Sequence, residues 1–463
     1  MRATLNLGEI IMNPNQSSAS PTSVNRRHFL KTSAAFAGTA VLGTLELSRS
    51  VHAAESNIIK LGLVGCGGRG SGAASDALTG DPNTKLVAVA DVFPDKIQAA
   101  LKNLSKTYGD RVAVDPSRQF SGLDGYRGVI ENCDVVMIAC ASRFHAQYGL
   151  AAVKAKKHVF VEKPAAVDVA GIYTIMEADE LCKRNGTGLL AGVTYRYHLG
   201  RREAIKRIHG GEIGDILAIQ CDYLRTPYRL IERDPSWSEM EYQFRNWYHF
   251  TWLSGDDVPQ SLIHNLDSAF WALNDELPEA AYGMGGRSTH FQTSMGTSFD
   301  HHHVTYEYPD GRCIYGSCRT AAGCYGSNKD IYHGTKGRCH FAAFQPPVFT
   351  DLKGNVTWKA DPLPTGNTPY IQEHKEFLAS IREGKPFQRA KILADSTMGT
   401  VLGQMAIYNG QRITWKDAMD SKFAFPPQGE ITMNTEPPVK LGADGIYPVA
   451  VPGQTKLLNV KKA

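Results

Sequence analysis

A glycine-rich turn lies between an apolar run and an alanine-rich segment in residues 58–78. The turn reads Val-Gly-Cys-Gly-Gly-Arg-Gly, and Gly65, Gly67 and Gly70 fit the pattern G-x-G-x-x-G. In that pattern the first glycine makes a tight turn, the second lets the backbone approach a diphosphate, and the third lets helix and strand pack closely. The stretch therefore predicts a strand, a diphosphate-binding loop and a helix whose N-terminus holds the diphosphate.

A second strand-like run, residues 85–90, ends in an acid, Asp91. This acid follows the last glycine by about 20 residues, the spacing expected of a carboxylate that holds an adenosine ribose. Such a carboxylate would accept hydrogen bonds from the ribose hydroxyls and repel a 2′-phosphate, so we expect NAD in preference to NADP. The alternative is that Gly70 caps an ordinary turn and Asp91 ends a surface strand.

Predicted strands and helices alternate through the first half of the chain. Alternation of this kind predicts an α/β fold with a doubly wound parallel sheet. Two clusters of mainly polar residues follow neighbouring strands, and such sheets bind ligands at that edge. The predicted helices are 95–108, 125–132, 146–155 and 169–184, and the strands are 134–140, 158–161 and 188–194. The clusters are Ala141, Ser142, Arg143 and His145 after one strand and Glu162, Lys163 and Pro164 after the next.

Beyond residue 195, proline and glycine turns separate strand-like runs with few regular helices between them. We expect an α+β domain with an open, mostly antiparallel sheet, one embedded helix, and two later helices that pack back on the first domain. The residues after 411 predict an arm across a neighbouring subunit or a loose wrap. The strands are 216–224, 279–285, 302–308 and 312–318, and the helices are 260–273, 368–383 and 394–408. The expected parts are 1–55 (signal and linker), 56–194 (dinucleotide-binding), 195–410 (substrate binding and oligomerisation) and 411–463 (C-terminal arm).

The N-terminal segment has the features of an export signal. Arg26 and Arg27 are followed closely by Phe-Leu-Lys, then by a mildly apolar run, 32–45, and by small residues at 51–53 that suit cleavage. This pattern resembles a twin-arginine signal and predicts a periplasmic or exported protein that uses the twin-arginine machinery. The alternative is a disordered basic tail.

Composition excludes some classes of function. The net charge is only +4 and no Lys/Arg block is present, so we expect no nucleic-acid partner. The nine cysteines are scattered and lack metal-ligand spacing. In a strand, His301 and His303 would share one face and leave His302 on the other, which gives at most two ligands. We therefore expect no metal site.

The strand-end motifs are similar to those of the Gfo/Idh/MocA family of oxidoreductases. The most specific pieces are 134–145 with 158–164, which ends in Glu-Lys-Pro, and a later His-x-x-Asp, His264 to Asp267. The resemblance covers about residues 58–414. It implies a Rossmann domain followed by a domain with an open sheet, and an NAD(P)-dependent oxidoreductase that acts on a sugar or polyol. It also implies a homodimer or homotetramer.

The resemblance assigns chemical roles to several residues. Lys163 would hydrogen-bond the reacting oxygen, and His264 would exchange its proton. Asp267, three residues further on, would fix the imidazole or bind a sugar hydroxyl. Tyr195 suits either a sugar face or a domain interface. The expected cofactor-binding residues are Gly65, Cys66, Gly67, Gly68, Arg69, Gly70, Asp91, Ala141, Ser142, His145, Glu162 and Lys163.

The chain departs from the family pattern at Gln260. Many sugar dehydrogenases of the family have an aspartate four residues before the histidine, and an amide can orient the imidazole but cannot take up a proton. The NAD-dependent glycosidases of the family, which also have twin-arginine signals and keep NAD bound, are therefore an alternative. They oxidise a ring carbon transiently and eliminate the glycosidic bond. A third alternative is a sugar-binding member without catalysis.

Overall fold

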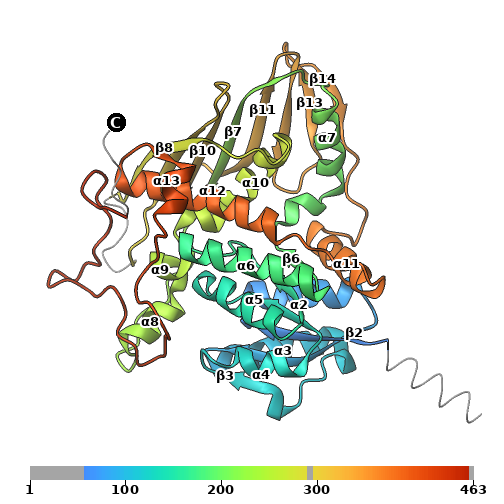
Figure 1. Cartoon of the computed structure of the whole chain (residues 1–463), viewed down its shortest axis with the longest axis vertical. Helices are drawn as coiled ribbons and strands as arrows, with labels where there is room; N and C mark the ends of the chain where they lie inside the picture. The colour runs from blue at the N-terminus through green and yellow to red at the C-terminus, as the bar shows by residue number, and fades with distance from the viewer. Residues whose placement is uncertain (1–56, 289–295, 458–463) are drawn as a thin grey trace, which may run out of the picture. The chain divides into compact units, whose positions relative to one another are not determined.

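The first sheet is parallel, as the alternating pattern predicts (Figure 1). This computed structural model describes residues 57–288 and 296–457. The strand order is β3-β2-β1-β4-β5-β6, so the chain reverses direction across the sheet between β1 and β4, where doubly wound folds bind dinucleotides. The strands are β1 (Ile59–Val64), β2 (Thr84–Asp91), β3 (Gln119–Ser121), β4 (Val135–Ile138), β5 (His158–Val161) and β6 (Leu189–Ala191).

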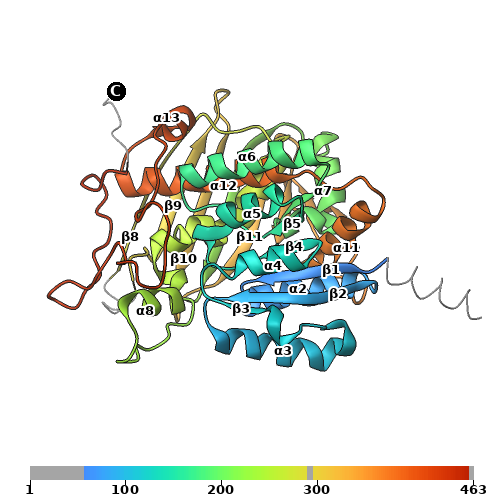
Figure 2. The ribbon, with the colours of Figure 1, turned by 60° about the horizontal axis from the view of Figure 1, so that its bottom comes forward.

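Helices cover both faces of this sheet (Figure 2). Alternate strand residues point to opposite faces. Leu61 and Leu63 pack with α2 and α3 on one face, while Val136 and Ile138 pack with α4, α5 and α6 on the other. The predicted helices are confirmed to within a few residues at each end. Their bounds are α2 (Gly68–Gly80), α3 (Pro94–Tyr108), α4 (Tyr126–Asn132), α5 (His145–Lys154) and α6 (Val169–Asn185).

The second sheet has nine strands in the order β14-β13-β12-β11-β7-β10-β9-β8-β15. Only the pair β7·β10 is parallel, so the prediction of a mostly antiparallel sheet is confirmed. The strands are β7 (Ile216–Arg225), β8 (Ala280–Gly286), β9 (His301–Glu307), β10 (Cys313–Thr320), β11 (Ser327–Gly334), β12 (Gly337–Ala342), β13 (Val348–Asp351), β14 (Val356–Lys359) and β15 (Ile413–Thr414).

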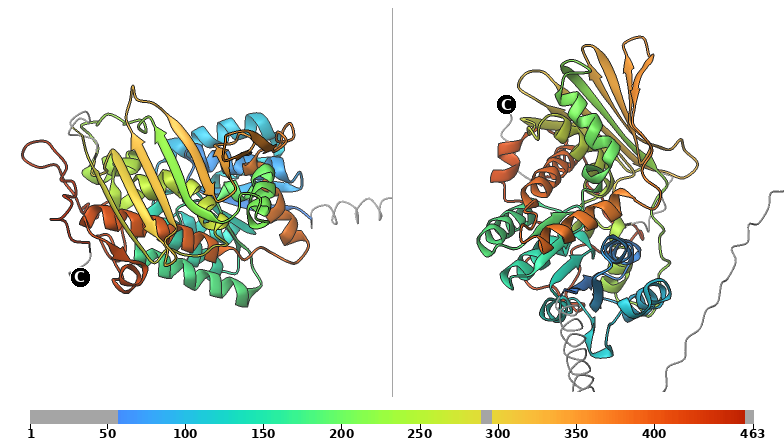
Figure 3. Two further views of the ribbon diagram at one scale, coloured as in Figure 1. Left: turned by 90° about the horizontal axis from the view of Figure 1, so that it is seen from above. Right: turned by 90° about the vertical axis from the view of Figure 1, so that its right-hand side faces the viewer.

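Helices pack on one face of the second sheet only (Figure 3). α12 (Ala390–Asn409) approaches so closely that a Cβ at Gly283 would lie 2.8 Å from Ile407, and the turn before α10 (Ile263–Ala272) approaches so closely that one at Gly316 would lie 2.8 Å from Leu262. The alternate residues of these strands point to the other face. Several of them are exposed apolar side chains, namely Tyr282, Met284 and Tyr315.

The predicted helix at 260–273 is wrong in its first turn. Residues Val258–Leu262 form a π-helical turn, and the α-helix α10 spans Ile263–Ala272. The sequence also missed β11 to β14 and several helices. α7 was missed because its residues are mostly charged, although Arg201 within it is fully buried. The remaining helices are α7 (Leu199–His209), α8 (Glu239–Arg245), α9 (Thr251–Ser254), α11 (Pro369–Arg382) and α13 (Trp415–Asp420).

Residues 59–463 form one compact unit, because α11 packs on α2 and α12 packs on both α6 and β8. The division near residue 194 therefore stays a prediction. The segment after α13 lies along its own chain: the backbone N–H of Phe425 donates to Asp168 at 2.9 Å, and Gln243 donates to the carbonyl of Val439 at 2.7 Å. These contacts correspond to the wrap that the sequence left as one of two alternatives.

The predicted signal at 1–55 lies outside the described residues. No helix in the described ranges combines the length and the apolar character needed to cross a membrane. None of the nine cysteines forms a disulfide.

Candidate functional site

A cavity of about 640 Å³, the main cavity, lies at the carboxyl ends of β1, β2 and β4. Gly65 turns the chain there with φ +96°, and a Cβ at Gly70 would lie 1.8 Å from the carbonyl oxygen of Gly65. Gly67 lines the cavity, and no atom lies within 4 Å of a Cβ built on it. Because α2 begins at Gly68, its free N–H groups start at this loop. The loop thus fits a dinucleotide diphosphate.

Asp91 lines the main cavity at the end of β2. Its Oδ2 accepts a hydrogen bond from the backbone N–H of Cys66 at 2.7 Å, and its Oδ1 accepts one from Phe93 at 2.9 Å. Burial raises the pKa of this carboxyl group. The Cys66 thiol is itself buried, so Cys66 contributes its backbone to the loop. Asp91 therefore ties the glycine loop to β2 and keeps a carboxylate beside the cavity.

A segment of the second half of the chain, residues 228–248, forms the opposite wall of the main cavity, and we call it the roof. Its aromatic rings stack on one another: Tyr228 on Tyr248 with ring centroids 3.8 Å apart, and Trp247 on Tyr248 at 3.7 Å. The segment after α13, which we call the C-terminal wrap, supports the roof, because the Tyr447 hydroxyl donates to Glu239 at 2.5 Å. Three cations also line the cavity, namely Lys96, Arg229 and Arg245.

The loop after β4 connects the two halves of the site. Ala141 lines the main cavity, and the buried Ser142 hydroxyl accepts from the Gln260 amide at 2.6 Å. His145 is buried, with its ring nitrogens 2.7 Å from the carbonyl of Pro164 and 2.9 Å from that of Cys140. Since both ring nitrogens are engaged within the protein, the prediction that His145 binds cofactor is corrected. Its ring instead ties together the loops after β4 and β5.

Arg69 and Glu162 bind each other. Arg69 Nε lies 2.9 Å from Glu162 Oε1, and the Arg69 guanidinium also pairs with Asp76 at 2.9 Å. Arg69 stacks over the ring of Tyr370, 4.5 Å from its centroid. The pair joins the glycine loop to the turn that carries Lys163, and neither member is among the residues that line the main cavity.

Lys163 lies between the two halves of the chain. Its Nζ donates to the backbone carbonyl of Gln260 at 2.5 Å. Burial lowers the pKa of Lys163 to about 8. Glu162 opposes this shift, whereas Arg225 adds to it. An ammonium group with a pKa near neutrality can both donate a hydrogen bond to a substrate oxygen and exchange a proton with it.

His264, on α10, is a half-buried neutral imidazole. Burial holds the pKa of His264 well below its usual range, and the charges of Lys163 and Arg201 lower it further. Its Nδ1 has no hydrogen-bond partner within the described residues. Tyr195 packs beside it, with ring centroids 5.2 Å apart, and burial raises the pKa of Tyr195 to about 12. His264 can therefore accept a hydrogen bond as a neutral ring, while Tyr195 stays protonated and packs beside the imidazole.

The expected partners of His264 have other contacts. Asp267 accepts from Arg196 Nε at 3.0 Å through both carboxylate oxygens and from Ser396 at 2.7 Å, so it anchors Arg196 and does not fix the imidazole. The Gln260 amide donates to Ser142 and to the carbonyl of Ser254, each at 2.6 Å, so it does not orient the imidazole either. The predicted roles of both residues toward His264 are thus corrected.

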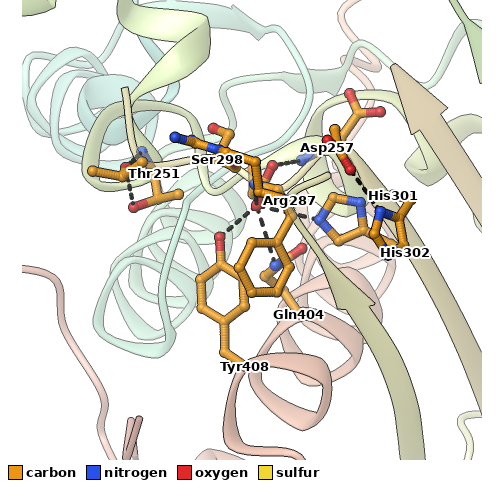
Figure 4. A network of polar contacts seen from close by, with 12 residues as sticks. Thr251, Asp257, Arg287, Ser298, His301, His302, Gln404 and Tyr408 are labelled. Carbon is orange, nitrogen blue, oxygen red and sulfur yellow. Dashed lines mark hydrogen bonds and ion pairs between the residues drawn. The ribbon is translucent and has the colours of Figure 1, made fainter. Parts of the chain in front are cut away.

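A second, small cavity of about 30 Å³, the side pocket, lies next to Gln260 (Figure 4). The polar side chains around it come from distant parts of the chain and take part in a buried network. Asp256 in this network accepts from His302 at 3.2 Å and from the backbone N–H of Phe299 at 2.9 Å. The lining is Arg225, Pro227, Tyr228, Tyr248, His249, Asp256, Asp257, Gln260, Arg287, Ser298, Phe299, Asp300 and Thr320.

Most of the side pocket was missed by sequence reasoning. The histidine run at 301–303 was the only nearby signal, and it was considered as a metal site. His302 instead pairs with Asp256, which raises the pKa of His302 despite its burial. Within 57–288 and 296–457, no three His, Cys, Asp or Glu side chains are grouped so that they could hold a metal ion.

Comparison with known proteins identifies the first part of the chain. The model of the oxidoreductase family with an NAD-binding Rossmann fold, Gfo/Idh/MocA, matches residues 59–192, so this part of the chain is similar to that family. The second part has the open mixed sheet found in solved sugar and polyol dehydrogenases of similar fold.

Two curated relatives resemble the chain over part of its length. The 2,7-anhydro-N-acetylneuraminate hydratase of Escherichia coli (strain K12) is 31% identical over 39% of this chain and 44% of its own. An inositol 2-dehydrogenase of Salmonella paratyphi B is 27% identical over 47% of this chain and 55% of its own. The alignments thus span about half the length of these relatives.

The similarity of fold extends further than these alignments. A solved scyllo-inositol dehydrogenase from Lactobacillus casei, with bound NAD(H) and scyllo-inositol, has a TM-score of 0.58 at 19% identity. The alignment covers 78% of this chain and 99% of that one. The two sheets described above therefore have a common arrangement in both proteins.

Proposed function

We propose that this protein is an NAD-dependent oxidoreductase that transfers a hydride between nicotinamide and a secondary alcohol of a sugar or polyol. The observation that carries the proposal is the position of Lys163. Its Nζ is held by the carbonyl of Gln260, which lines the side pocket, and Tyr228 and Tyr248 line both cavities. The lysine is thus linked through Gln260 to the side pocket, whose wall shares Tyr228 and Tyr248 with the main cavity.

The residues have complementary chemical tasks. Bound nicotinamide would supply the hydride acceptor or donor. Lys163 would hold the substrate oxygen and take its proton, since its pKa of about 8 is close to neutral pH. His264, as a neutral imidazole, would accept a hydrogen bond from a substrate hydroxyl group.

We propose NAD as the cofactor in preference to NADP. The Asp91 carboxylate at the adenosine end of the cavity supports this choice, whereas Lys96, Arg229 and Arg245 in the same cavity could attract a 2′-phosphate. In an Asp91→Ser variant the NAD to NADP affinity ratio should fall by about tenfold or more, which corresponds to one lost charge-assisted contact. An unchanged ratio would contradict the cofactor assignment.

The proposed function is tested on the purified full chain. Its bound nucleotide is identified by mass after denaturation, and the protein is then incubated with added NAD and a panel of sugars and polyols. The proposal expects nucleotide absorbance of the reduced form to grow with at least one of them. Absence of both bound nucleotide and reduction across the panel would contradict it.

A second candidate is glycoside hydrolysis through transient oxidation of a ring carbon. The hydratase among the relatives and the absence of a carboxylate contact to His264 favour it. In this reaction Lys163 or His264 would remove the proton next to the oxidised carbon so that the glycosidic bond can eliminate. Release of aglycone from a nitrophenyl glycoside without net reduction of NAD would distinguish it from the first candidate.

We also propose homo-oligomerisation through the open face of the second sheet. The apolar side chains there, Met284 at 69% exposed and Tyr315 at 40%, support this proposal. Met284→Glu should lower the mass measured by light scattering to that of a monomer. An unchanged mass would contradict the use of this face.

Export by the twin-arginine machinery remains the proposal for localisation, and the Arg26–Arg27 pair supports it. Replacing both arginines by lysine should retain the protein in the cytoplasmic fraction, while Arg2→Lys serves as the matched control. Equal export of the paired variant would contradict this route.

A further inference from the structure

We infer that the side pocket seats one neutral hydroxyl or hydroxymethyl group of the substrate and rejects a carboxylate at that position. The inference rests on the proposed function, because it concerns the substrate that Lys163 would hold. It assigns specificity to Asp257, Arg287 and Ser298, which are labelled in Figure 4.

Three polar atoms in the wall of the pocket have no hydrogen-bond partner within the described residues. They are Asp257 Oδ2, Arg287 Nη1 and Ser298 Oγ, and each of these atoms is buried. The other atoms of the same groups are engaged: Asp257 Oδ1 binds Arg225 at 2.5 Å, and Arg287 Nε donates to the carbonyl of Ser298 at 2.9 Å. Buried polar atoms are almost always paired, so a ligand or a water has to complete this set.

The pocket is the size of one functional group. Its volume of about 30 Å³ suits about two water-sized groups. A hydroxyl or hydroxymethyl group has that size, whereas a sugar ring is much larger. The rest of the substrate would lie toward the junction with the main cavity, where Tyr228 and Tyr248 line both spaces.

The three unpaired atoms require a ligand group that can both donate and accept hydrogen bonds. Asp257 Oδ2 can only accept while it is ionised, and Arg287 Nη1 can only donate. A carboxylate would be repelled by Asp257, and an ammonium group would be repelled by Arg287. A hydroxyl group donates to the first and accepts from the second, and Ser298 Oγ can take either role.

Most charged residues around the pocket are paired within the protein, whereas Arg287 donates only to backbone carbonyls among the described residues. Arg225 pairs with Asp257, and His302 pairs with Asp256. Asp300 lies 2.5 Å from His301 Nδ1 and accepts from the backbone N–H of Ser288 at 2.6 Å. The pocket thus offers no unmatched cationic cluster of the kind that recognises acidic sugars.

The side pocket adjoins the reacting group. The carbonyl of Gln260, a lining residue, accepts from Lys163 Nζ at 2.5 Å. A group seated in the pocket would therefore sit on a carbon near the one that reacts, and it would fix which hydroxyl of a polyol faces Lys163.

The first test compares matched substrates. Glucose and galactose are measured against glucuronate and galacturonate, both in turnover and in calorimetric binding to the full chain loaded with NADH. Neutral sugars should bind at least about tenfold more tightly than the matching uronates, the factor expected for one lost hydrogen bond and an added repulsion. Preference for the uronates would overturn the inference.

The variant Asp257→Asn tests the inference more directly than the comparison of substrates does. The amide keeps an oxygen for Arg225 and Ser261 and replaces the acceptor in the pocket with a donor. The KM for a neutral sugar should rise about tenfold, and the uronate should lose its disadvantage, while NADH affinity is unchanged. An unchanged ratio of neutral to acidic sugar would overturn the inference.

Ser298→Ala separates binding from stability. Its Oγ has no partner, so its removal should leave the Tm unchanged while the affinity for the neutral sugar falls severalfold. Ser317→Ala, on β10, removes a hydroxyl group that lies 3.0 Å from His303 Nδ1 and outside the pocket, so it is the control for affinity and should leave the affinity unchanged. A lower Tm with unchanged affinity would indicate a structural role, and unchanged values of both would indicate that the pocket holds only water. Either result overturns the inference.

The calorimetric measurement keeps this inference distinct from the proposed function. If sugars bind with the expected selectivity but NAD is never reduced, the oxidoreductase proposal is wrong and the inference about the side pocket is supported. If NAD is reduced but the substitutions leave selectivity unchanged, the inference about the side pocket is wrong and the oxidoreductase proposal is supported.

Discussion

The two cavities of this protein are built by different means. The main cavity is shaped by backbone: Gly65 turns the chain, Gly70 admits the close approach of helix and strand, and α2 presents its N–H groups. The side pocket is shaped by side chains such as Asp257, which pairs with Arg225, and Arg287, which donates to backbone carbonyls. The first cavity should therefore be sensitive to added atoms and the second to changes in charge or hydrogen bonding.

The largest effect is expected at the junction of the two cavities. Lys163→Ala removes the ammonium group while leaving both walls in place. Turnover should fall by about 10³-fold, the scale of a lost acid–base and electrostatic contribution, with NAD affinity unchanged. Steady-state kinetics and nucleotide titration measure the two quantities, and the exposed Lys154→Ala is the control. Turnover close to that of the wild type would remove the lysine from the mechanism.

A single methyl group at the glycine turn tests the main cavity. In Gly70→Ala the new Cβ would meet the carbonyl oxygen of Gly65 at 1.8 Å, so the loop has to move. Nucleotide affinity should fall by about 10- to 100-fold, the scale of an overpacked site. Gly72→Ala is the matched control, because its nearest neighbour would be a side-chain nitrogen of Arg69 at 3.5 Å. Equal affinities in the two variants would show that the turn tolerates added atoms.

Titration of Lys163 predicts a pH dependence. Burial lowers the pKa of this lysine to about 8, so its neutral form, which can take the substrate proton, grows as pH rises through about 8. Turnover in the direction of alcohol oxidation should increase by about tenfold per pH unit below that value and then level off. Initial rates across the pH range measure the midpoint. Oxidation that slows as pH rises through this range would reverse the assigned proton transfer.

The smallest effect is expected behind the roof. Tyr447→Phe removes a hydroxyl group that donates to Glu239 at 2.5 Å and accepts from Arg233 at 2.8 Å. The free energy of unfolding should fall by about 1 kcal/mol, and release of nucleotide should accelerate severalfold because the roof opens more often. Denaturant titration and stopped-flow release measure these changes. An unchanged release rate would show that the wrap stabilises the fold without holding the roof.

The two cavities also differ in how far their residues could be predicted. Gly65, Gly70 and Asp91 are close in sequence and act through local backbone geometry, so a short motif contains most of the information. Arg225, Asp257 and Ser298 meet only after the second sheet has formed, and no local pattern marks them.

Gln260 and Asp267, which are near His264 in the sequence, also show that spacing alone does not predict side-chain contacts. Their spacing on one helix favoured contacts of Gln260 and Asp267 with the imidazole, but distant partners decided their orientation. Asp267 accepts a hydrogen bond from Arg196, and the Gln260 amide donates to Ser142 and to the carbonyl of Ser254. The π-helical turn at Val258–Leu262 also changed the register on which the spacing argument depended.

The C-terminal wrap has a consequence for biosynthesis. Val439 and Tyr447 hold α8 and the roof from behind, and they are translated some 200 residues after that segment. While the ribosome is still making the last part of the chain, the glycine loop and β1 to β6 already exist, but the roof lacks its support. We therefore expect the wall of the main cavity formed by residues 228–248 to gain its support from Tyr447 only late in synthesis.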